Sequence, residues 1–199
     1  MKMRRFSALG CVAALAAASW STAARSEVLH ADVSGFVVRH QVAVMAPRET
    51  AWRMLVGHVA EWWHSDHTYS GNAANLYIEE RALGCFCEQL GEQDAVVHLT
   101  VTAIRTGSLL RLTGGLGPLG LMGVDGNMVF SFGESEGKTI VVLEYRVGGY
   151  DPDGLEAIAP AVDGMLGEQL ERYVRFVESG SPTAEDSADD ALAPIPDGL

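Results

Sequence analysis

Segments in which apolar and polar residues alternate make up most of the chain between residues 36 and 147. In Phe36–Met45, a phenylalanine and three valines fall on one face. This period of two predicts a half-buried strand, because successive side chains of a strand point to opposite faces of its sheet. Such patterns predict about seven strands: Phe36–Met45, Leu76–Glu80, Cys85–Leu90, Ala95–Arg105, Leu109–Thr113, Asn127–Glu134 and Thr139–Val147.

Helical spacing appears in two places. After the first strand, Pro47 stands at a favoured first helical position and Trp52 lies on the apolar stripe of the helix that follows. A second short helical turn is predicted over residues 59–63. Apolar residues then recur at helical spacing over residues 155–178, which predicts a long C-terminal helix. Within it, Pro160 is expected to mark a kink or a late start.

The order of these elements predicts an α+β fold. Hairpin-connected strands form an antiparallel sheet, and the helices are expected on one side of it. Residues 34–180 are assigned to this single domain, since a chain of 199 residues is long enough for one core. Two loops interrupt the pattern, a polar one over residues 64–75 and a glycine-rich one over residues 114–126.

The two ends of the chain differ from the domain. Residues 1–23 have basic residues followed by an apolar run of about 15 residues and then small residues, which predicts a secretory signal peptide cleaved after Ala23. Residues 181–199 contain three prolines, five acidic residues and no basic ones, so we expect a disordered acidic tail. The mature protein is therefore expected to be periplasmic or secreted.

The charge of the chain excludes some partners. The formal net charge is −12, and cleavage after Ala23 removes Lys2, Arg4 and Arg5 without removing any acid, which leaves −15. So acidic a surface repels phosphate backbones, and nucleic-acid binding is not expected. No other segment has the length and apolar character to cross a bilayer, so no stable membrane insertion is expected after cleavage.

Four stretches of the sequence carry a resemblance to a known superfamily. They are Ala46-Pro47 through Trp52, Trp62-Trp63, Leu83–Glu88 and the helical stretch 155–178. With them the chain resembles the START-like or SRPBCC superfamily, and more narrowly its branch related to heat-shock-protein ATPase activators and polyketide cyclases. The resemblance implies a helix-grip fold, in which a curved antiparallel sheet wraps around the long C-terminal helix and encloses an apolar cavity.

Two features depart from the activator branch. An exported protein meets neither ATP nor the chaperone that such activators serve. The glycine-rich stretch Gly114–Pro118 also lacks the lysine of a phosphate-binding loop and does not open a helix. We therefore expect no cofactor.

The resemblance places the ligand cavity between the sheet and the long helix. Its apolar wall is expected from Phe86, Met128, Phe130, Leu143, Val162, Met165 and Leu166. The segment Trp62–Gly71 adds groups that bind flat molecules and their polar atoms, above all Trp63, His67 and Tyr69. The alternative for the wall is plain core packing, and for the segment a surface loop that plugs the cavity mouth.

Three polar residues within strands are candidates for catalysis. Glu88 and His98 would form a proton-transferring pair if both faced inward, but the alternation of β-structure argues against an inward His98, since Val97 and Leu99 belong to the apolar face. Tyr145 shares its face with apolar residues and is the best-placed inward hydroxyl. Asp163 and Gln169 flank the apolar stripe of the long helix, and either could reach that hydroxyl.

A metal site is the weakest alternative. His64 and His67 together with Cys85 and Cys87 supply nitrogens and sulfurs that zinc accepts, but their spacings are unusual for a structural site. A disulfide between the two cysteines is disfavoured, because bridging residues two apart strains the backbone. They are therefore expected to be thiols.

The sequence thus predicts an exported binding protein for a small hydrophobic molecule, either a lipid, a polyketide or an aromatic metabolite. The alternatives are a cyclase- or hydrolase-like enzyme that uses the same cavity, with Glu88, His98, His67 or Tyr145 transferring the proton, and a zinc-binding module.

Overall fold

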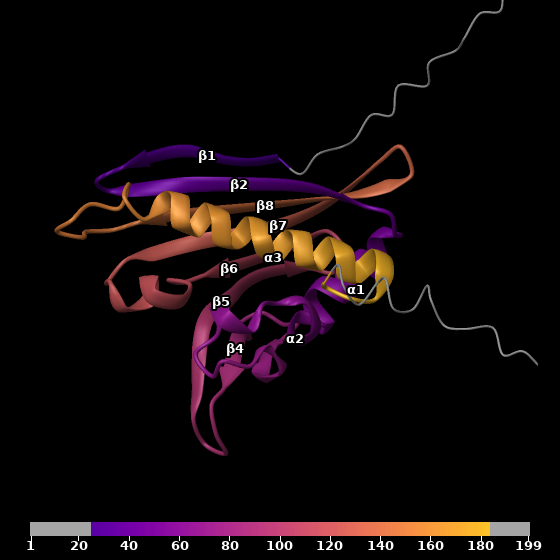
Figure 1. The fold of residues 1–199 in the computed structure, drawn as a ribbon, viewed down its shortest axis with the longest axis horizontal. Helices are drawn as coiled ribbons and strands as arrows, with labels where there is room; N and C mark the ends of the chain where they lie inside the picture. The colour runs from indigo at the N-terminus through magenta and orange to yellow at the C-terminus, as the bar shows by residue number, and fades with distance from the viewer. Residues whose placement is uncertain (1–24, 184–199) are drawn as a thin grey trace, which may run out of the picture.

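The computed structural model describes residues 25–183 (Figure 1). The predicted signal peptide lies outside the described residues, and so does the predicted acidic tail beyond Thr183. The described part forms one antiparallel sheet with helices on one side, so the predicted α+β class is confirmed. No helix in residues 25–183 combines the length and apolar character needed to cross a membrane.

The sheet has eight strands in the order β1-β2-β8-β7-β6-β5-β4-β3. Every neighbouring pair is antiparallel. The strands are β1 (Arg25–Asp32), β2 (Gly35–Val44), β3 (Leu76–Ile78), β4 (Cys85–Gln89), β5 (Ala95–Arg105), β6 (Leu109–Thr113), β7 (Asp125–Ser135) and β8 (Lys138–Gly148). Seven of them match the predicted strands. The eighth, β1, was not among the predicted strands, and it pairs with β2 as an edge strand.

Three α-helices and three short 3-10 turns complete the described chain. The helices are α1 (Arg48–Gly57), α2 (Val59–Trp62) and α3 (Ala159–Ser179), and the turns are η1 (Ser65–His67), η2 (Ala73–Asn75) and η3 (Gly117–Leu121). The long helix α3 starts late, with Pro160 in its first turn, where a missing N–H costs no hydrogen bond. It ends at Gly180, whose φ of 81° is readily adopted only by glycine.

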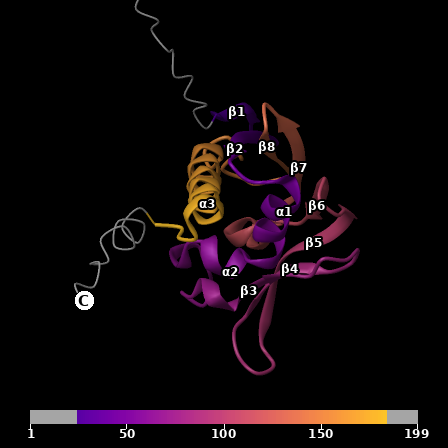
Figure 2. The ribbon, with the colours of Figure 1, turned by 90° about the vertical axis from the view of Figure 1, so that its right-hand side faces the viewer.

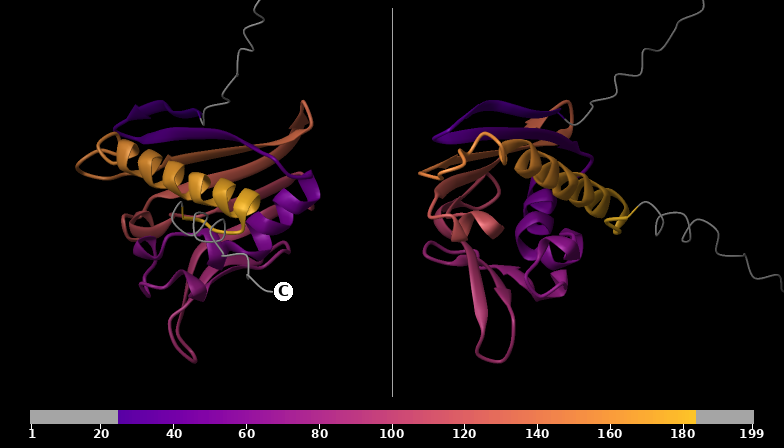
Figure 3. Two further views of the ribbon diagram at one scale, coloured as in Figure 1. Left: turned by 45° about the vertical axis from the view of Figure 1, so that its right-hand side comes forward. Right: turned by 60° about the vertical axis from the view of Figure 1, so that its left-hand side comes forward.

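The sheet curves, and all three helices lie on its concave side (Figure 2). Helix α3 packs across β2 and β1 and reaches α1 and α2 at its C-terminal end (Figures 1 and 3). Two hydrogen bonds fasten this end: the Tyr173 hydroxyl donates to the carbonyl of Ala51 at 2.8 Å, and Nε of Arg172 donates to the carbonyl of Trp62 at 2.9 Å. The helices before β3 are thereby held to the helix that closes the chain.

Aromatic residues of the helices anchor them to the concave face. Trp52 of α1 meets Phe132 of β7 edge-on, with ring centroids 5.3 Å apart, and its Nε1 donates to Glu80 at 2.8 Å. Trp62 packs against Tyr173 at 5.5 Å and Trp63 against Phe86 at 5.2 Å. All of these rings are buried, so the two tryptophans after α1 connect its C-terminal side to both α3 and β4.

Candidate functional site

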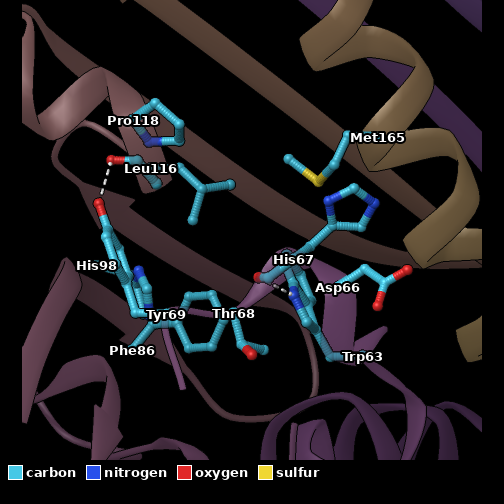
Figure 4. Close-up of a pocket in the computed structure, with 11 residues that line it drawn as sticks. Trp63, Asp66, His67, Thr68, Tyr69, Phe86, His98, Leu116, Pro118 and Met165 are labelled. Carbon is cyan, nitrogen blue, oxygen red and sulfur yellow. Dashed lines mark hydrogen bonds between the residues drawn. The ribbon is translucent and has the colours of Figure 1, made fainter. Parts of the chain in front are cut away.

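A pocket of about 210 Å³ opens between three elements: the loop that runs from Trp63 through η1, the turn η3, and the middle of α3. Strands β4 and β5 contribute the side chains at its inner end. Figure 4 shows Met165 reaching in from α3 and Leu116 and Pro118 facing it from η3. The lining residues are Trp63, Asp66, His67, Thr68, Tyr69, Phe86, His98, Leu116, Gly117, Pro118 and Met165.

Hydrogen bonds hold the rim of the pocket in place (Figure 4). The Tyr69 hydroxyl donates to the carbonyl of Gly117 at 3.2 Å and so ties the loop after η1 to η3. The indole Nε1 of Trp63 donates to the carbonyl of His67 at 3.0 Å and so holds η1 against the Trp63 side chain in the pocket wall. The rim therefore depends on side chains that also line the pocket.

Glu88 of β4 lies behind this wall and is fully buried. Its carboxylate accepts the backbone N–H groups of Tyr69 at 2.9 Å and Ser70 at 2.5 Å, and also faces Nε2 of His98 at 3.0 Å. Burial raises the pKa of Glu88, but the hydrogen bonds from Ser70, Tyr69 and His98 together outweigh it and hold the pKa below its ordinary value of 4.5. Glu88 is therefore an ionised carboxylate that anchors the loop.

His98 of β5 faces inward, and the prediction that it points outward is wrong. Only 6% of its surface is exposed, whereas Val97 is 61% exposed. The reason is a β-bulge: the register of β4 with β5 shifts between Phe86, which pairs with Leu99, and Cys87, which pairs with Val97. His98 is the extra residue of this bulge, so His98 and Leu99 are both buried in succession, and strict alternation fails.

The His98 ring forms part of a small aromatic cluster at the inner end of the pocket. Tyr69 stacks on it with ring centroids 5.6 Å apart and planes at 23°, and Phe86 lies 5.2 Å away. Burial lowers the pKa of His98 below its ordinary value of 6.5, although Glu88 acts in the opposite direction. At neutral pH the ring is therefore uncharged. Its Nδ1 is buried and has no hydrogen-bond partner among the described residues.

Tyr145 lies outside the pocket, contrary to the prediction that its hydroxyl faces the ligand. The side chain is fully buried, its hydroxyl donates to the carbonyl of Gly114 at 2.8 Å, and it accepts the N–H of Leu116 at 3.0 Å. Burial raises its pKa to about 12. With both hydrogen bonds made inside the protein, Tyr145 positions the glycine-rich loop.

The apolar residues assigned to the cavity divide into two groups. Phe86 and Met165 line the pocket. Phe130 and Val162 do not, and neither do Met128, Leu143 and Leu166; these five are buried in the core. For most of the residues predicted to form the apolar wall of the cavity, the alternative prediction of plain core packing is therefore correct. The reason is that α3 packs directly on the sheet.

The two polar residues expected beside Tyr145 have other partners. The carboxylate of Asp163 faces the imidazole of the buried His40 of β2, with Oδ1 and Nε2 2.9 Å apart. Burial lowers the pKa of His40 below 6.5, and Asp163 opposes this shift. Gln169 accepts the backbone N–H of His64 at 2.7 Å. Both residues thus help to seat α3.

The proposed zinc ligands do not come together. Cys85 and Cys87 are joined by a disulfide, so the expectation of two thiols is wrong; their Cα atoms are 5.4 Å apart, which suits such a bond. His67 lines the pocket and His64 lies beside it, with ring centroids 5.8 Å apart, and the carboxylate of Glu168 faces His64 at 3.9 Å and His67 at 3.3 Å. Within residues 25–183, no group of three or more histidine, cysteine, aspartate or glutamate side chains could hold a metal ion.

Sequence reasoning missed the contribution of η3 to the site. Leu116, Gly117 and Pro118 line the pocket, but the glycine-rich stretch was predicted only to be a loop that does not bind phosphate. The sequence did contain an indication of this role, because a loop with several leucines is expected to pack them against another part of the protein or a ligand. Asp66 and Thr68 lie in the segment Trp62–Gly71, which was expected to bind the ligand. His98 was already a candidate, but its inward direction depends on where the bulge falls.

Comparison with known proteins identifies the architecture. No family model matches the chain, and no curated protein matches it. Solved structures do match: a conserved protein of unknown function from Enterococcus faecalis superposes with a TM-score of 0.54 at 15% identity, over 83% of this chain and 84% of that one. CalU16 from Micromonospora echinospora gives 0.52 at 12% identity, over 85% and 93% of the two chains.

The fold is the helix-grip fold. DynU16, a protein in the dynemicin biosynthetic locus, has it too, with a TM-score of 0.52 and 16% identity over 73% of this chain and 48% of that one. The predicted helix-grip fold is thereby confirmed. Because the identities are so low, the similarity does not extend to a ligand or an activity.

Proposed function

We propose that this protein is exported and binds a small, neutral, hydrophobic molecule in the pocket between η1, η3 and α3. The observation that carries the proposal is the composition of the pocket wall. Trp63, Tyr69 and Phe86 supply aromatic surface, Leu116 and Met165 supply aliphatic surface, and a buried histidine stands among them. Mostly apolar walls with a few fixed polar groups are typical of small-molecule sites.

The size of the pocket favours a compact ligand. Its volume is about 210 Å³. A dry apolar cavity of about 150 Å³ accommodates benzene, while sites for drug-sized molecules begin at about 300 Å³. Of the three ligand classes expected from the sequence, an aromatic metabolite of one or two rings fits this volume better than a lipid chain or an extended polyketide.

Export rests on the sequence of residues 1–23. The structure is compatible with it, since strand β1 begins at Arg25 and cleavage after Ala23 would leave every described element intact. An intact-mass measurement of the protein from its export compartment would give the new N-terminus.

A second candidate is an enzyme that transfers a proton in the same pocket. The observation that favours it is the buried Glu88–His98 pair, whose uncharged imidazole could accept a proton while the carboxylate stabilises the resulting imidazolium. Turnover that His98→Phe abolishes while ligand binding persists would favour the enzyme over the binder.

Native mass spectrometry of the exported protein, purified without organic additives, tests the proposed function. We expect an adduct that matches a neutral compound of one or two rings and is released on denaturation. A protein that carries no adduct, and whose thermal unfolding is unchanged by a panel of monocyclic and bicyclic aromatics, would contradict binding. Release of a long-chain lipid would contradict the ligand class.

A further inference from the structure

A disulfide between Cys85 and Cys87 shortens strand β4 at the inner end of the pocket. The Cα atoms of the two cysteines are 5.4 Å apart. Two steps along an ordinary strand span about 6.4–6.8 Å, so this piece of β4 is drawn together by about 1 Å. Phe86, the residue between the cysteines, lines the pocket and packs edge-on against Trp63. A covalent clamp therefore encloses one residue of the pocket wall.

The β-bulge of β5 lies opposite this shortened segment. Along β4 the two cysteines are two positions apart. The partners of Cys85 and Cys87 on β5, Thr100 and Val97, are three positions apart. A shortened β4 leaves β5 with chain to spare, and the bulge takes up this surplus. The extra residue is His98, so the disulfide lies where the inward direction of His98 is decided.

Regular pairing of the two strands would change the pocket wall. If β4 and β5 paired without a bulge beyond Phe86, His98 would stand opposite Cys87. Because a shift of one residue moves side chains to the other face of a sheet, the imidazole would leave the pocket. Val97 would take its place beside Glu88, whose carboxylate would lose the imidazole Nε2 that is now 3.0 Å away. The inner end of the pocket therefore depends on the bulge.

The disulfide itself lies on the outer face of the sheet. Cys87 pairs with Tyr77 on one side and with Val97 on the other. These two partners are 40% and 61% exposed, and side chains paired across a sheet share a face, so the cysteines point away from Phe86 and the pocket. Cys85 is only half-buried on that face. A reductant therefore has a route to the bond that does not pass through the pocket.

We propose that the Cys85–Cys87 disulfide is a redox switch for ligand binding, which gives the pocket its full affinity when the bond is formed and weakens it when the bond is reduced. The inference rests on the proposed function and adds regulation to the same site. In the reduction, a thiolate of a dithiol attacks the sulfur of Cys85, forms a mixed disulfide and releases Cys87. The second thiol of the reductant then displaces Cys85. The protein gains two electrons and two protons, and the dithiol becomes a disulfide.

The switch gives the proposed export a consequence for binding. Export would carry the chain from a reducing compartment, where thiols stay reduced, to an oxidising one, where disulfides persist. Uptake of the ligand is then confined to the compartment in which the bond forms. Linkage is reciprocal, so the factor by which the bond raises ligand affinity is also the factor by which bound ligand protects the bond from reduction.

Calorimetric titration with toluene, before and after reduction with dithiothreitol, tests the switch. We expect the reduced protein to bind about tenfold more weakly, because Phe86 and His98 must then be ordered again on binding. Full affinity should return on reoxidation. The double variant Cys85→Ala/Cys87→Ala should bind weakly with and without dithiothreitol, which controls for effects of the reductant itself.

Two measurements on the wild type show whether the change is local. Proton NOEs between the rings of His98 and Phe86 should be present in the oxidised protein and lost in the reduced one. Those between Trp52 and Phe132 should remain in both. In a buffer of reduced and oxidised dithiothreitol, saturating toluene should raise the ratio of oxidised to reduced protein about tenfold.

The outcomes distinguish this inference from the proposed function. If both forms bind toluene equally, strand pairing alone holds the bulge and the switch is overturned, while the binding site stands. A His98–Phe86 contact that survives reduction would overturn it as well, and so would loss of the Trp52–Phe132 contact, since the bond would then hold the whole fold. If neither form binds toluene, both the switch and the proposed function fail.

Discussion

At the scale of single residues, the interior holds two histidines, and each faces a carboxylate. His98 lies 3.0 Å from Glu88, and His40 lies 2.9 Å from Asp163. In both, burial lowers the pKa of the imidazole below 6.5 in spite of the neighbouring acid. Both imidazoles are therefore neutral in the folded protein, and both have a lower pKa there than in the unfolded chain.

This arrangement predicts acid sensitivity. When the folded-state pKa of a histidine is depressed, the unfolded chain binds more protons, so the stability it contributes is present above pH 6.5 and is lost as the pH falls below that value. We expect the free energy of unfolding, measured with urea, to decline between pH 7 and pH 5. In His98→Phe the decline should be shallower by up to about 1.4 kcal/mol per pH unit, the effect of one proton.

The remaining decline in that variant should come from His40 and be removed by a second substitution there. A wild-type protein whose unfolding free energy stays constant over this range would show that neither histidine is held neutral.

His98 and Tyr145 show what residue-level sequence reasoning can and cannot reach. Alternation correctly placed Tyr145 on the buried face. Alternation could not show that the backbone groups of Gly114 and Leu116, some 30 positions earlier in the chain, would form hydrogen bonds with the Tyr145 hydroxyl. For His98 the same alternation gave the wrong face, because a bulge depends on how two strands pair and not on the composition of either.

At the scale of elements, the sequence predicted well where an element has one buried face. The strands from β2 to β8 and helix α3 each have such a face. Strand β1 was missed because it is an edge strand whose side chains are almost all exposed from Glu27 onward, so it carries no alternation. The stretch Leu83–Glu88 was one of those that carry the predicted resemblance, and the close packing of the turn before β4 explains the glycine at position 84.

Gly84 in that turn and Gly133 in β7 offer a matched pair of substitutions. A Cβ on Gly84 would lie 2.6 Å from the backbone oxygen of Glu79 and 2.9 Å from that of Arg81, so the chain would have to shift. A Cβ on Gly133 in β7 would meet nothing within 4 Å. We expect Gly84→Ala to lower the free energy of unfolding by about 1–3 kcal/mol, as overpacking does.

Gly133→Ala should change the free energy of unfolding by about 0.5 kcal/mol or less, as surface substitutions usually do. Since β4 carries Phe86 and Glu88, Gly84→Ala should also weaken ligand binding. Equal stability of the two variants in urea unfolding would mean that the turn before β4 is not packed as described.

At the scale of the whole molecule, the helix-grip fold brings distant parts of the chain to one small pocket. The loop after α2, the glycine-rich turn and the middle of α3 meet there, although Trp63 and Met165 are about a hundred positions apart. The chain has a formal net charge of −12. Such a charge disfavours anionic ligands, which agrees with a neutral occupant.

The most direct test of the account fills the pocket from α3. Met165→Trp adds bulk where Met165 lines the pocket, while Met45→Trp makes the same substitution at a site that is 64% exposed. Calorimetric titration with toluene should give equal affinity for the wild type and Met45→Trp, and at least tenfold weaker binding for a folded Met165→Trp. Unchanged affinity in Met165→Trp, or no binding by the wild type, would contradict the claim that this pocket holds a small hydrophobic molecule.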